Sequence, residues 1–328
     1  MKSEKIFITG GAGYVGAVLV PHLLNEGYEV TVFDLMIYGE QVLPEDSRLT
    51  TIKGDIRDAD LLRMSIPGHD VVIHLACISN DPSFELNPTL GRSINLDAFR
   101  PLVEISRNVG VRKFVYASSS SVYGVKQEQN VDESMTLEPL TDYSRFKADC
   151  EQILLEYQSP DFTTVTIRPA TVCGYSPRQR LDVVVNILTN FAYHKREITV
   201  FGGTQLRPNI HIEDMVAAYI AVLRAPVDVI AGQIYNAGYE NQPVSELAEI
   251  VRQEVGADVK LTTTSTDDNR SYHISSQKIK EQLGFRATFN INKAVKDLLD
   301  AFEKGWLPNS LEDEIYFNIR RMQSLNLQ

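Results

Sequence analysis

Short apolar runs alternate with amphipathic stretches through the first two thirds of the chain. Runs rich in β-branched and aromatic residues predict buried strands of a parallel sheet. They lie at 5–9, 29–34, 49–53, 71–76, 113–117 and 163–167. Stretches with helical period lie between them, the longest at 92–109 and 142–157. This alternation is typical of a sheet covered by helices on both faces, so we expect an α/β fold with a doubly wound parallel sheet.

A glycine-rich turn follows the first strand. Gly10, Gly13 and Gly16 are spaced three apart, and the apolar pattern from Val15 onward has helical period. Between a strand and a helix, such a turn directs backbone N–H groups and the helix dipole at an anion, and the missing Cβ atoms let a pyrophosphate come close. We therefore predict a dinucleotide site at 10–16.

The second strand ends at Asp34, roughly twenty residues past the last glycine. A carboxylate at this place accepts hydrogen bonds from the adenosine ribose and repels a 2′-phosphate. Asp34 therefore predicts NAD rather than NADP.

Two further strand ends contribute to this prediction. Asp55, before Ile56, has two compatible interpretations: a hydrogen bond to the adenine amino group, or a cap for the helix that begins near Asp58. His74 lies inside an apolar run, which favours a core histidine over a catalytic one. The small Ala76 that follows fits a backbone pressed against a cofactor.

Four serines, 118–121, follow the fifth strand. A serine run is often a solvated linker, but the carboxyl edge of a parallel sheet is where ligands bind. Tyr143 and Lys147 lie four residues apart near the start of a helix that Asp142 is expected to cap, so they share one helical face. An ammonium group near a phenol lowers its pKa from ~10, which makes the tyrosine a usable base.

Together these motifs resemble, in order, those of the extended short-chain dehydrogenases/reductases, in the branch of NAD-dependent nucleotide-sugar epimerases and dehydratases. The resemblance implies a Rossmann-type sheet and extends from residue 5 to about 300. Residues 168–174 are similar to the family's Arg-Pro-x-Asn-Val-Tyr-Gly, with Thr171 in place of the asparagine that commonly touches substrate and Cys173 in place of tyrosine. Arg207 and Arg270 match two arginines that bind the nucleotide diphosphate.

The resemblance also implies a role for each site residue. Tyr143 is the base, Lys147 tunes it and holds the nicotinamide ribose, and Ser119 hydrogen-bonds the reacting oxygen. The expected cofactor-binding residues are Gly10, Gly13, Tyr14, Val15, Gly16, Asp34, Asp55, Ile56, Leu75, Ala76, Ser118, Tyr143 and Lys147. The expected substrate-binding residues are Ser119, Ser120, Thr171, Arg207, Arg270 and Tyr272. No metal site is expected.

The residues after Ser119 distinguish the reactions of this family. Its 4,6-dehydratases carry Asp-Glu there, its decarboxylases a glutamate at the second position, and its 3,5-epimerases a cysteine that works with a second acid/base group. Ser120 and Ser121 can act as neither acid nor base near neutral pH, and 175–177 offer no second group. We therefore expect a nucleotide-sugar epimerase, most simply at C4. The alternatives are a nucleotide-sugar dehydrogenase or ketoreductase with net redox change and, less favoured, a non-catalytic NAD-binding regulatory protein.

Size and charge add limits. With 328 residues we expect an NAD-binding domain at 1–170 and, at 171–328, a smaller α/β region that mainly binds the substrate and returns some segments to the sheet. The net charge of −11 argues against nucleic acid or an anionic membrane surface as a partner. No apolar run approaches the ~20 residues of a membrane span, and no signal peptide is expected before the first strand.

Three cysteines without metal-like spacing favour reduced thiols in a cytoplasmic protein. The resemblance implies a homodimer paired through the helices at 92–109 and 142–157. The tail at 306–328 has roughly helical spacing, which predicts a packed terminal helix and leaves a lid or interface role open.

Overall fold

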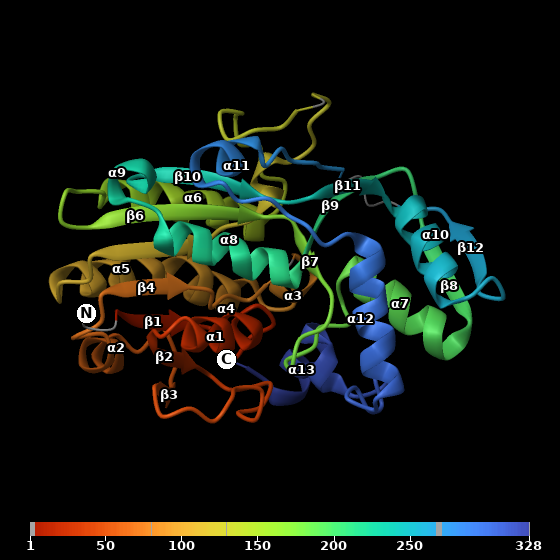
Figure 1. Cartoon of the computed structure of the whole chain (residues 1–328), viewed down its shortest axis with the longest axis horizontal. Coiled ribbons are helices and arrows are strands. Elements are labelled where there is room, and N and C mark those ends of the chain that lie inside the picture. Colours follow the sequence, from red (N-terminus) through yellow and green to blue (C-terminus); the bar gives the residue numbers. More distant parts are fainter. Residues whose placement is uncertain (1–3, 80, 129, 267–270, 328) are drawn as a thin grey trace.

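A computed structural model describes residues 4–79, 81–128, 130–266 and 271–327, and its centre is a seven-stranded sheet (Figure 1). The strand order is β10-β6-β5-β4-β1-β2-β3, and every neighbouring pair is parallel. The strands are β1 (Lys5–Thr9), β2 (Glu29–Asp34), β3 (Leu49–Lys53), β4 (Val71–His74), β5 (Lys113–Ala117), β6 (Thr163–Pro169) and β10 (Gln233–Ala237). The order reverses between β1 and β4, which is the point where doubly wound sheets bind ligands. The predicted fold class is confirmed.

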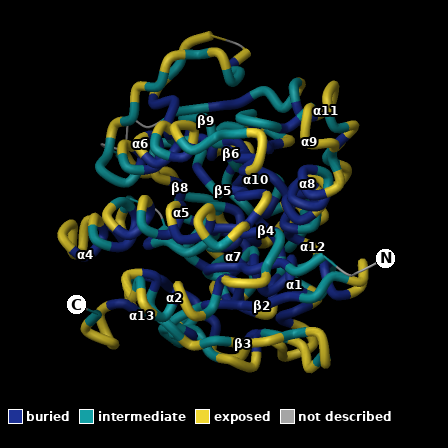
Figure 2. The backbone as a smooth tube through the Cα atoms, turned by 90° about the vertical axis from the view of Figure 1, so that its left-hand side faces the viewer, coloured by how far each residue is buried: buried dark blue, intermediate teal, exposed yellow. Residues whose placement is uncertain are grey.

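Helices cover both faces of this sheet because its strands are apolar on both sides. Ile6 and Ile8 of β1 belong to one hydrophobic cluster, whereas Phe7 between them belongs to another. The first cluster includes residues of α1 (Gly16–Asn25), α8 (Ile212–Arg224), α9 (Val227–Ile230) and α11 (Gln277–Leu283). The second includes residues of α2 (Ala59–Ser65), α3 (Asp81–Glu85), α5 (Phe99–Asn108) and α6 (Asp142–Glu156). Figure 2 shows the central strands buried and β3, at the edge, partly exposed.

A smaller region begins where β6 ends, so it lies at the carboxyl edge of the large sheet (Figure 1). It contains a three-stranded sheet and a separate parallel pair of strands, with a hydrophobic core of its own. The three-stranded sheet has β7 (Thr171–Cys173), β9 (Leu206–His211) and β11 (Glu240–Pro243), and the pair is β8 (Glu197–Phe201) with β12 (Lys260–Thr264). Its helices are α7 (Val184–Lys195), α10 (Val244–Val255) and α12 (Ile291–Glu303).

The single helix expected at 92–109 was wrong. The structure has three consecutive helical segments over this part of the chain. They are α4 (Pro88–Arg92), the π-helical turn η1 (Ser93–Asp97) and α5. Asn87 caps the first by accepting a hydrogen bond from the N–H of Leu90 (3.0 Å). In the π turn the buried Asn95 side chain bonds the N–H and C=O of Ile78 at 2.8 and 2.9 Å. The widened turn thus fixes the loop that follows β4.

Helix α6 is capped by Thr141 rather than by Asp142, which corrects the expected cap. The Thr141 hydroxyl accepts from the N–H of Ser144 (3.2 Å), and the Ser144 hydroxyl accepts from the N–H of Thr141 (3.1 Å). Asp142 is the first helical residue and pairs with Arg145. This reciprocal cap fixes the start of the helix that carries Tyr143 and Lys147.

The tail contains the expected packed helix. It forms the short turn η3 (Glu314–Tyr316) and then α13 (Asn318–Leu325), whose Met322 is buried. In the part of the chain that the structure describes, no helix is both long and apolar enough to cross a membrane.

Candidate active site

A cavity of about 350 Å³ lies at the carboxyl edge of the large sheet. The sequence-predicted residues that line it are Gly10, Gly13, Tyr14, Val15, Gly16, Asp34, Asp55, Ile56, Leu75, Ala76, Ser118, Ser119, Ser120, Tyr143, Lys147, Thr171 and Tyr272. Most of them follow strands that are far apart in sequence and that the parallel sheet brings to one edge, whereas Tyr143 and Lys147 come from α6.

The glycine turn is tightly packed against its surroundings. Gly10 has a φ of +75°, and a Cβ built on it would lie 2.5 Å from the backbone nitrogen of Ala76. A Cβ on Gly16 would overlap the carbonyl oxygen of Gly11. Glycine is therefore needed for the turn itself, and its backbone forms the cradle that fits a pyrophosphate.

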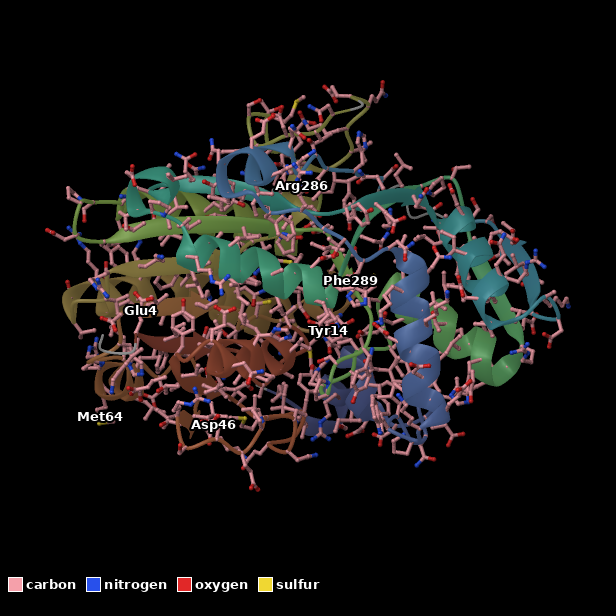
Figure 3. All side chains as sticks on the ribbon, viewed as in Figure 1. Glu4, Tyr14, Asp46, Met64, Arg286 and Phe289 are labelled. Atoms are coloured by element: carbon pink, nitrogen blue, oxygen red, sulfur yellow. The ribbon has the colours of Figure 1, made fainter. Side chains whose placement is uncertain are left out.

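Tyr14, which is labelled in Figure 3, links this turn to the segment after β7 through hydrogen bonds. Its hydroxyl donates to the carbonyl of Gly174 (2.6 Å) and accepts from Nδ2 of Asn186 (2.9 Å), and its own carbonyl accepts from Ser176 (2.8 Å). The Tyr14 side chain thus joins the cofactor cradle to the smaller region.

Asp34 is held by the backbone at the end of β2. Its Oδ2 accepts from the N–H of Ala12 (3.0 Å), and its Oδ1 accepts from the N–H of Met36 (2.8 Å). Burial raises the pKa of Asp34, while these two N–H groups and the nearby Arg178 act in the opposite direction. Each carboxylate oxygen retains acceptor capacity for a ribose hydroxyl.

Asp55 does not cap α2, so that interpretation was wrong. Asp58 caps the helix by accepting from the N–H of Leu61 (2.9 Å), whereas Asp55 forms an ion pair with Arg57 (2.6 Å). Asp55 and Ile56 still line the cavity, as the adenine interpretation requires.

His74 is a core histidine as expected. Its Nδ1 lies 2.6 Å from the Thr9 hydroxyl, and burial lowers its pKa to about 3.

The three expected catalytic residues converge on the same cavity. The Ser119 hydroxyl accepts from the N–H of Ser121 (3.1 Å) and caps the short turn η2 (Ser120–Tyr123). Lys147 is buried, and its Nζ donates to the carbonyl of Ala117 (2.6 Å). The same Nζ lies 5.9 Å from the centre of the Tyr143 ring.

The pKa of Tyr143 shifts in the direction opposite to the one expected from the sequence. Burial, with smaller contributions from Cys77 and Asp81, raises this pKa well above its ordinary value. The Arg180 guanidinium and a hydrogen bond with Ser119 lower it, but burial outweighs both. The Lys147 ammonium group donates to the Ala117 carbonyl. Its position four residues after Tyr143 therefore does not give Tyr143 the lowered pKa that the sequence had suggested.

A buried polar network connects the elements that carry the serine run and the Tyr143–Lys147 pair. The sequence analysis did not predict this network. Arg168 forms an ion pair with Glu151 of α6 (2.6 Å) and donates to the Tyr123 hydroxyl (2.7 Å). The same Glu151 accepts a hydrogen bond from Ser118. The network joins β5, β6 and α6, which carry the serine run and the Tyr–Lys pair. Arg168 is therefore structural, and its Arg-Pro motif was the only sequence signal.

Of the two arginines expected to bind the diphosphate, Arg207 and Arg270, the structure describes only Arg207. Arg207 on β9 is not among the residues lining the cavity, but its guanidinium carbon lies 5.4 Å from the centre of the Tyr272 ring, which does line it. Arg270 lies outside the described residues. Their convergence on one diphosphate therefore stays a prediction.

Two arginines that the sequence analysis passed over line the cavity. Arg178 and Arg180 follow β7, and Arg178 is 3% exposed. Their only sequence signal is the basic pair in Pro177-Arg178-Gln179-Arg180, directly after the motif at 168–174. Within the described ranges, no group of three or more His, Cys, Asp or Glu side chains could hold a metal ion.

The doubly wound sheet, its glycine cradle and the Ser119–Tyr143–Lys147 group define an extended short-chain dehydrogenase/reductase. The model of the NAD dependent epimerase/dehydratase family matches residues 6–238, and the chain belongs to this family. It is an enzyme family, and NAD is its cofactor.

Similar proteins span several reactions. The chain is 32% identical over 272 residues to the uncharacterized UDP-glucose epimerase YtcB of Bacillus subtilis, covering 78% of this chain and 84% of that protein. It is 27% identical to UDP-glucose 4-epimerase GEPI48 of Cyamopsis tetragonoloba, covering 90% and 94%. Among solved structures, the dTDP-glucose 4,6-dehydratase DesIV of Streptomyces venezuelae, with NAD bound, has a TM-score of 0.84 at 23% identity, covering 94% and 100%. That likeness shows the fold alone.

Proposed function

We propose that this chain is an NAD-dependent nucleotide-sugar epimerase that inverts C4 through a transient 4-ketosugar. One observation carries the proposal. Ser119, Tyr143 and Lys147 meet at the cofactor cavity, whereas the next positions, 120 and 121, present only hydroxyl groups. This set serves oxidation and reduction at one carbon and offers no acid/base pair for elimination.

The residues of the chain divide the proton chemistry between them. Bound NAD supplies a hydride acceptor and, in the return step, a hydride donor. Tyr143 would take the proton from the sugar hydroxyl as the hydride leaves that carbon. After the ketosugar turns over, the hydride would return to the other face of the same carbon, and Tyr143 would return the proton to its oxygen. Ser119 donates a hydrogen bond to the same oxygen, and Lys147 holds the nicotinamide ribose. Positioning and a largely buried site supply the rest of the rate.

The acidic residues that line the cavity within the described ranges have other partners, which supports an epimerase over a dehydratase or a decarboxylase. Asp34 accepts two backbone hydrogen bonds, Asp55 pairs with Arg57, and Asp81 accepts from the Thr141 hydroxyl. None of them adjoins Ser119 in sequence, where the expected acid and base of those enzymes lie.

The proposed substrate is a nucleoside-diphosphate sugar, bound mainly by the region at 171–328. Tyr272 and Thr171 line the cavity, and Arg207 lies beside Tyr272. Both of the sequence relatives described above are named as UDP-glucose epimerases. We further propose a cytoplasmic homodimer that uses neither nucleic acid nor membrane as a partner, in keeping with the net charge of −11.

Incubation with a panel of UDP, GDP, dTDP and CDP sugars, followed by NMR of the product, tests the proposal. We expect inversion at C4 of one sugar with no net NADH. Stoichiometric NADH would instead assign a dehydrogenase, and loss of water or carbon dioxide would assign a dehydratase or decarboxylase. The Arg207→Ala variant should need roughly ten- to a hundredfold more substrate, because a charge-assisted hydrogen bond is worth ~1.5–3 kcal/mol.

A further inference from the structure

The C-terminal segment forms part of the cofactor cavity. Asn318, Met322 and Leu327 line the same cavity as the glycine turn, although about three hundred residues or more separate them from it in sequence. Figure 1 shows α13 between the large sheet and α12. Met322 belongs to the same hydrophobic cluster as Ile56 and Ile78, and Leu327 packs against that cluster. The tail therefore lies on the side of the cavity where the adenine is expected.

Asn318 joins α13 to three loops at the carboxyl edge. Its Oδ1 accepts from the Tyr38 hydroxyl (3.0 Å) and from Nη2 of Arg178 (2.5 Å). Its Nδ2 donates to the Ser79 hydroxyl (2.9 Å), and its backbone N–H donates to Asp182 (2.8 Å). Tyr38 follows β2, Ser79 follows β4, and the other two follow β7. One buried asparagine thus joins these three loops at the wall of the cavity.

Arg180 completes this cluster. Its Nε donates to Asp182 (2.8 Å), and its Nη1 donates to the Ser79 hydroxyl (3.1 Å). We call the set the clasp, and it consists of Tyr38, Ser79, Arg178, Arg180, Asp182 and Asn318. A second anchor lies on the same helix, where Nε of Arg321 donates to the carbonyl of Ile37 (2.7 Å).

Two donors of the clasp have no partner among the described residues. They are Nε of Arg178 and Nη2 of Arg180, and both atoms are buried. A buried charged donor left without an acceptor is costly, so native sites supply one. Both side chains line the cavity, and the glycine turn on its other wall is built for a pyrophosphate.

The position of Arg178 favours the pyrophosphate of the cofactor over that of the substrate. Its guanidinium carbon lies 3.5 Å from the centre of the Tyr38 ring, only four residues beyond Asp34. Its charge also acts on the Asp34 carboxylate, the expected ribose ligand. The contact with Tyr38, together with the influence on Asp34, places Arg178 on the adenosine side of the cavity.

We propose that the clasp belongs to the cofactor site: Arg178 and Arg180 donate to the pyrophosphate of NAD, and α13, held by Asn318, closes the adenosine end so that NAD stays bound between turnovers. The inference rests on the NAD cofactor and is independent of which sugar reaction the enzyme performs. Retention of NAD suits a reaction that regenerates NAD in each turnover, because the cofactor then does not have to be exchanged.

The first test separates a pyrophosphate contact from a general structural effect. Arg178→Met keeps an unbranched side chain against Tyr38 but removes the donors. ADP-ribose and adenosine are competed against the NAD bound to the full chain. We expect ADP-ribose to weaken by roughly ten- to a hundredfold and adenosine by much less, because the adenosine end loses only the hydrogen bond from Arg178 to Asn318. Equal weakening of both, weakening of UDP instead, or no change would overturn the assignment.

The second test measures retention, without reference to activity. The release of NAD from the holoenzyme is followed by chase with excess fluorescent etheno-NAD. Asn318→Ala removes three side-chain hydrogen bonds, so release should accelerate at least about tenfold. Gln323→Ala, an exposed position on the same helix, should release NAD at the wild-type rate.

A milder variant covers a failure of Asn318→Ala to fold. Tyr38→Phe removes only the hydroxyl that donates to Asn318 and should also speed release. Wild-type release from both clasp variants, or from the only one that folds, would overturn the retention role even if the enzyme proves to be an epimerase.

Discussion

At the scale of single residues, the proposed reaction depends on one phenol and one hydroxyl. Tyr143→Phe should lose nearly all turnover and still bind NAD, because it removes the proton acceptor and little packing. Ser119→Ala should be impaired less, since it removes one hydrogen bond. Steady-state turnover with the active nucleotide sugar, beside NAD titration, checks both. A Tyr143→Phe variant with wild-type turnover would place the base elsewhere.

Asp34 is expected to govern the choice of cofactor. Asp34→Ala removes the acceptors for the ribose hydroxyls together with the charge that repels a 2′-phosphate. NAD should therefore bind more weakly, and the preference for NAD over NADP should narrow. Competitive titration of both cofactors measures this, and a wild-type chain that binds NADP more tightly than NAD would contradict it.

His74 should make folding sensitive to acid. The folded chain keeps its pKa at about 3, whereas the unfolded chain titrates near 6.5, so only the unfolded state takes up this proton as the pH falls below 6.5. The free energy of unfolding should thus drop by about 2 kcal/mol between pH 7 and 5 on this account. His74→Asn retains an acceptor for Thr9 but cannot take up this proton. Urea unfolding at pH 7 and at pH 5 should therefore show a difference in the free energy of unfolding that is about 2 kcal/mol smaller for the variant than for the wild type. An equal difference between the two pH values in both proteins would exclude this role of His74.

At the scale of elements, the buried Arg168–Glu151 pair connects β6 to the helix that carries Tyr143. Arg168→Met leaves a buried carboxylate without its cation and should lower the free energy of unfolding by about 3–5 kcal/mol. Arg145→Ala breaks an exposed pair on the same helix and should cost no more than about 0.5 kcal/mol. Urea unfolding compares the two, and equal losses would show that burial of the pair is not what matters.

At the scale of the whole molecule, the homodimer is a prediction. The expected interface helices α5 and α6 carry an exposed Arg100–Glu156 ion pair on their outer faces. Light scattering at micromolar concentration should give twice the chain mass of 36.8 kDa. Arg100→Glu should shift the protein toward monomer, whereas Arg63→Glu, on α2, should not. A monomeric wild type would refute the prediction.

Most of the cofactor cradle follows from the sequence because its signals are local. The glycine turn, Asp34 and the serine run each adjoin a strand of recognisable pattern, and the ends of parallel strands meet at one edge. The Tyr143–Lys147 spacing likewise places both residues on one face of a helix. The doubly wound fold and the family could therefore be predicted before any contact was known.

Only the tertiary structure decided what depends on burial and on distant contacts. Thr141 rather than Asp142 caps α6 because its backbone is extended there, which spacing does not reveal. Burial, rather than Lys147, sets the direction of the Tyr143 pKa shift. Arg178 and Asn318 are ordinary polar residues in sequence, 140 positions apart, and they become part of the cofactor cavity only because the chain folds the tail over the glycine turn.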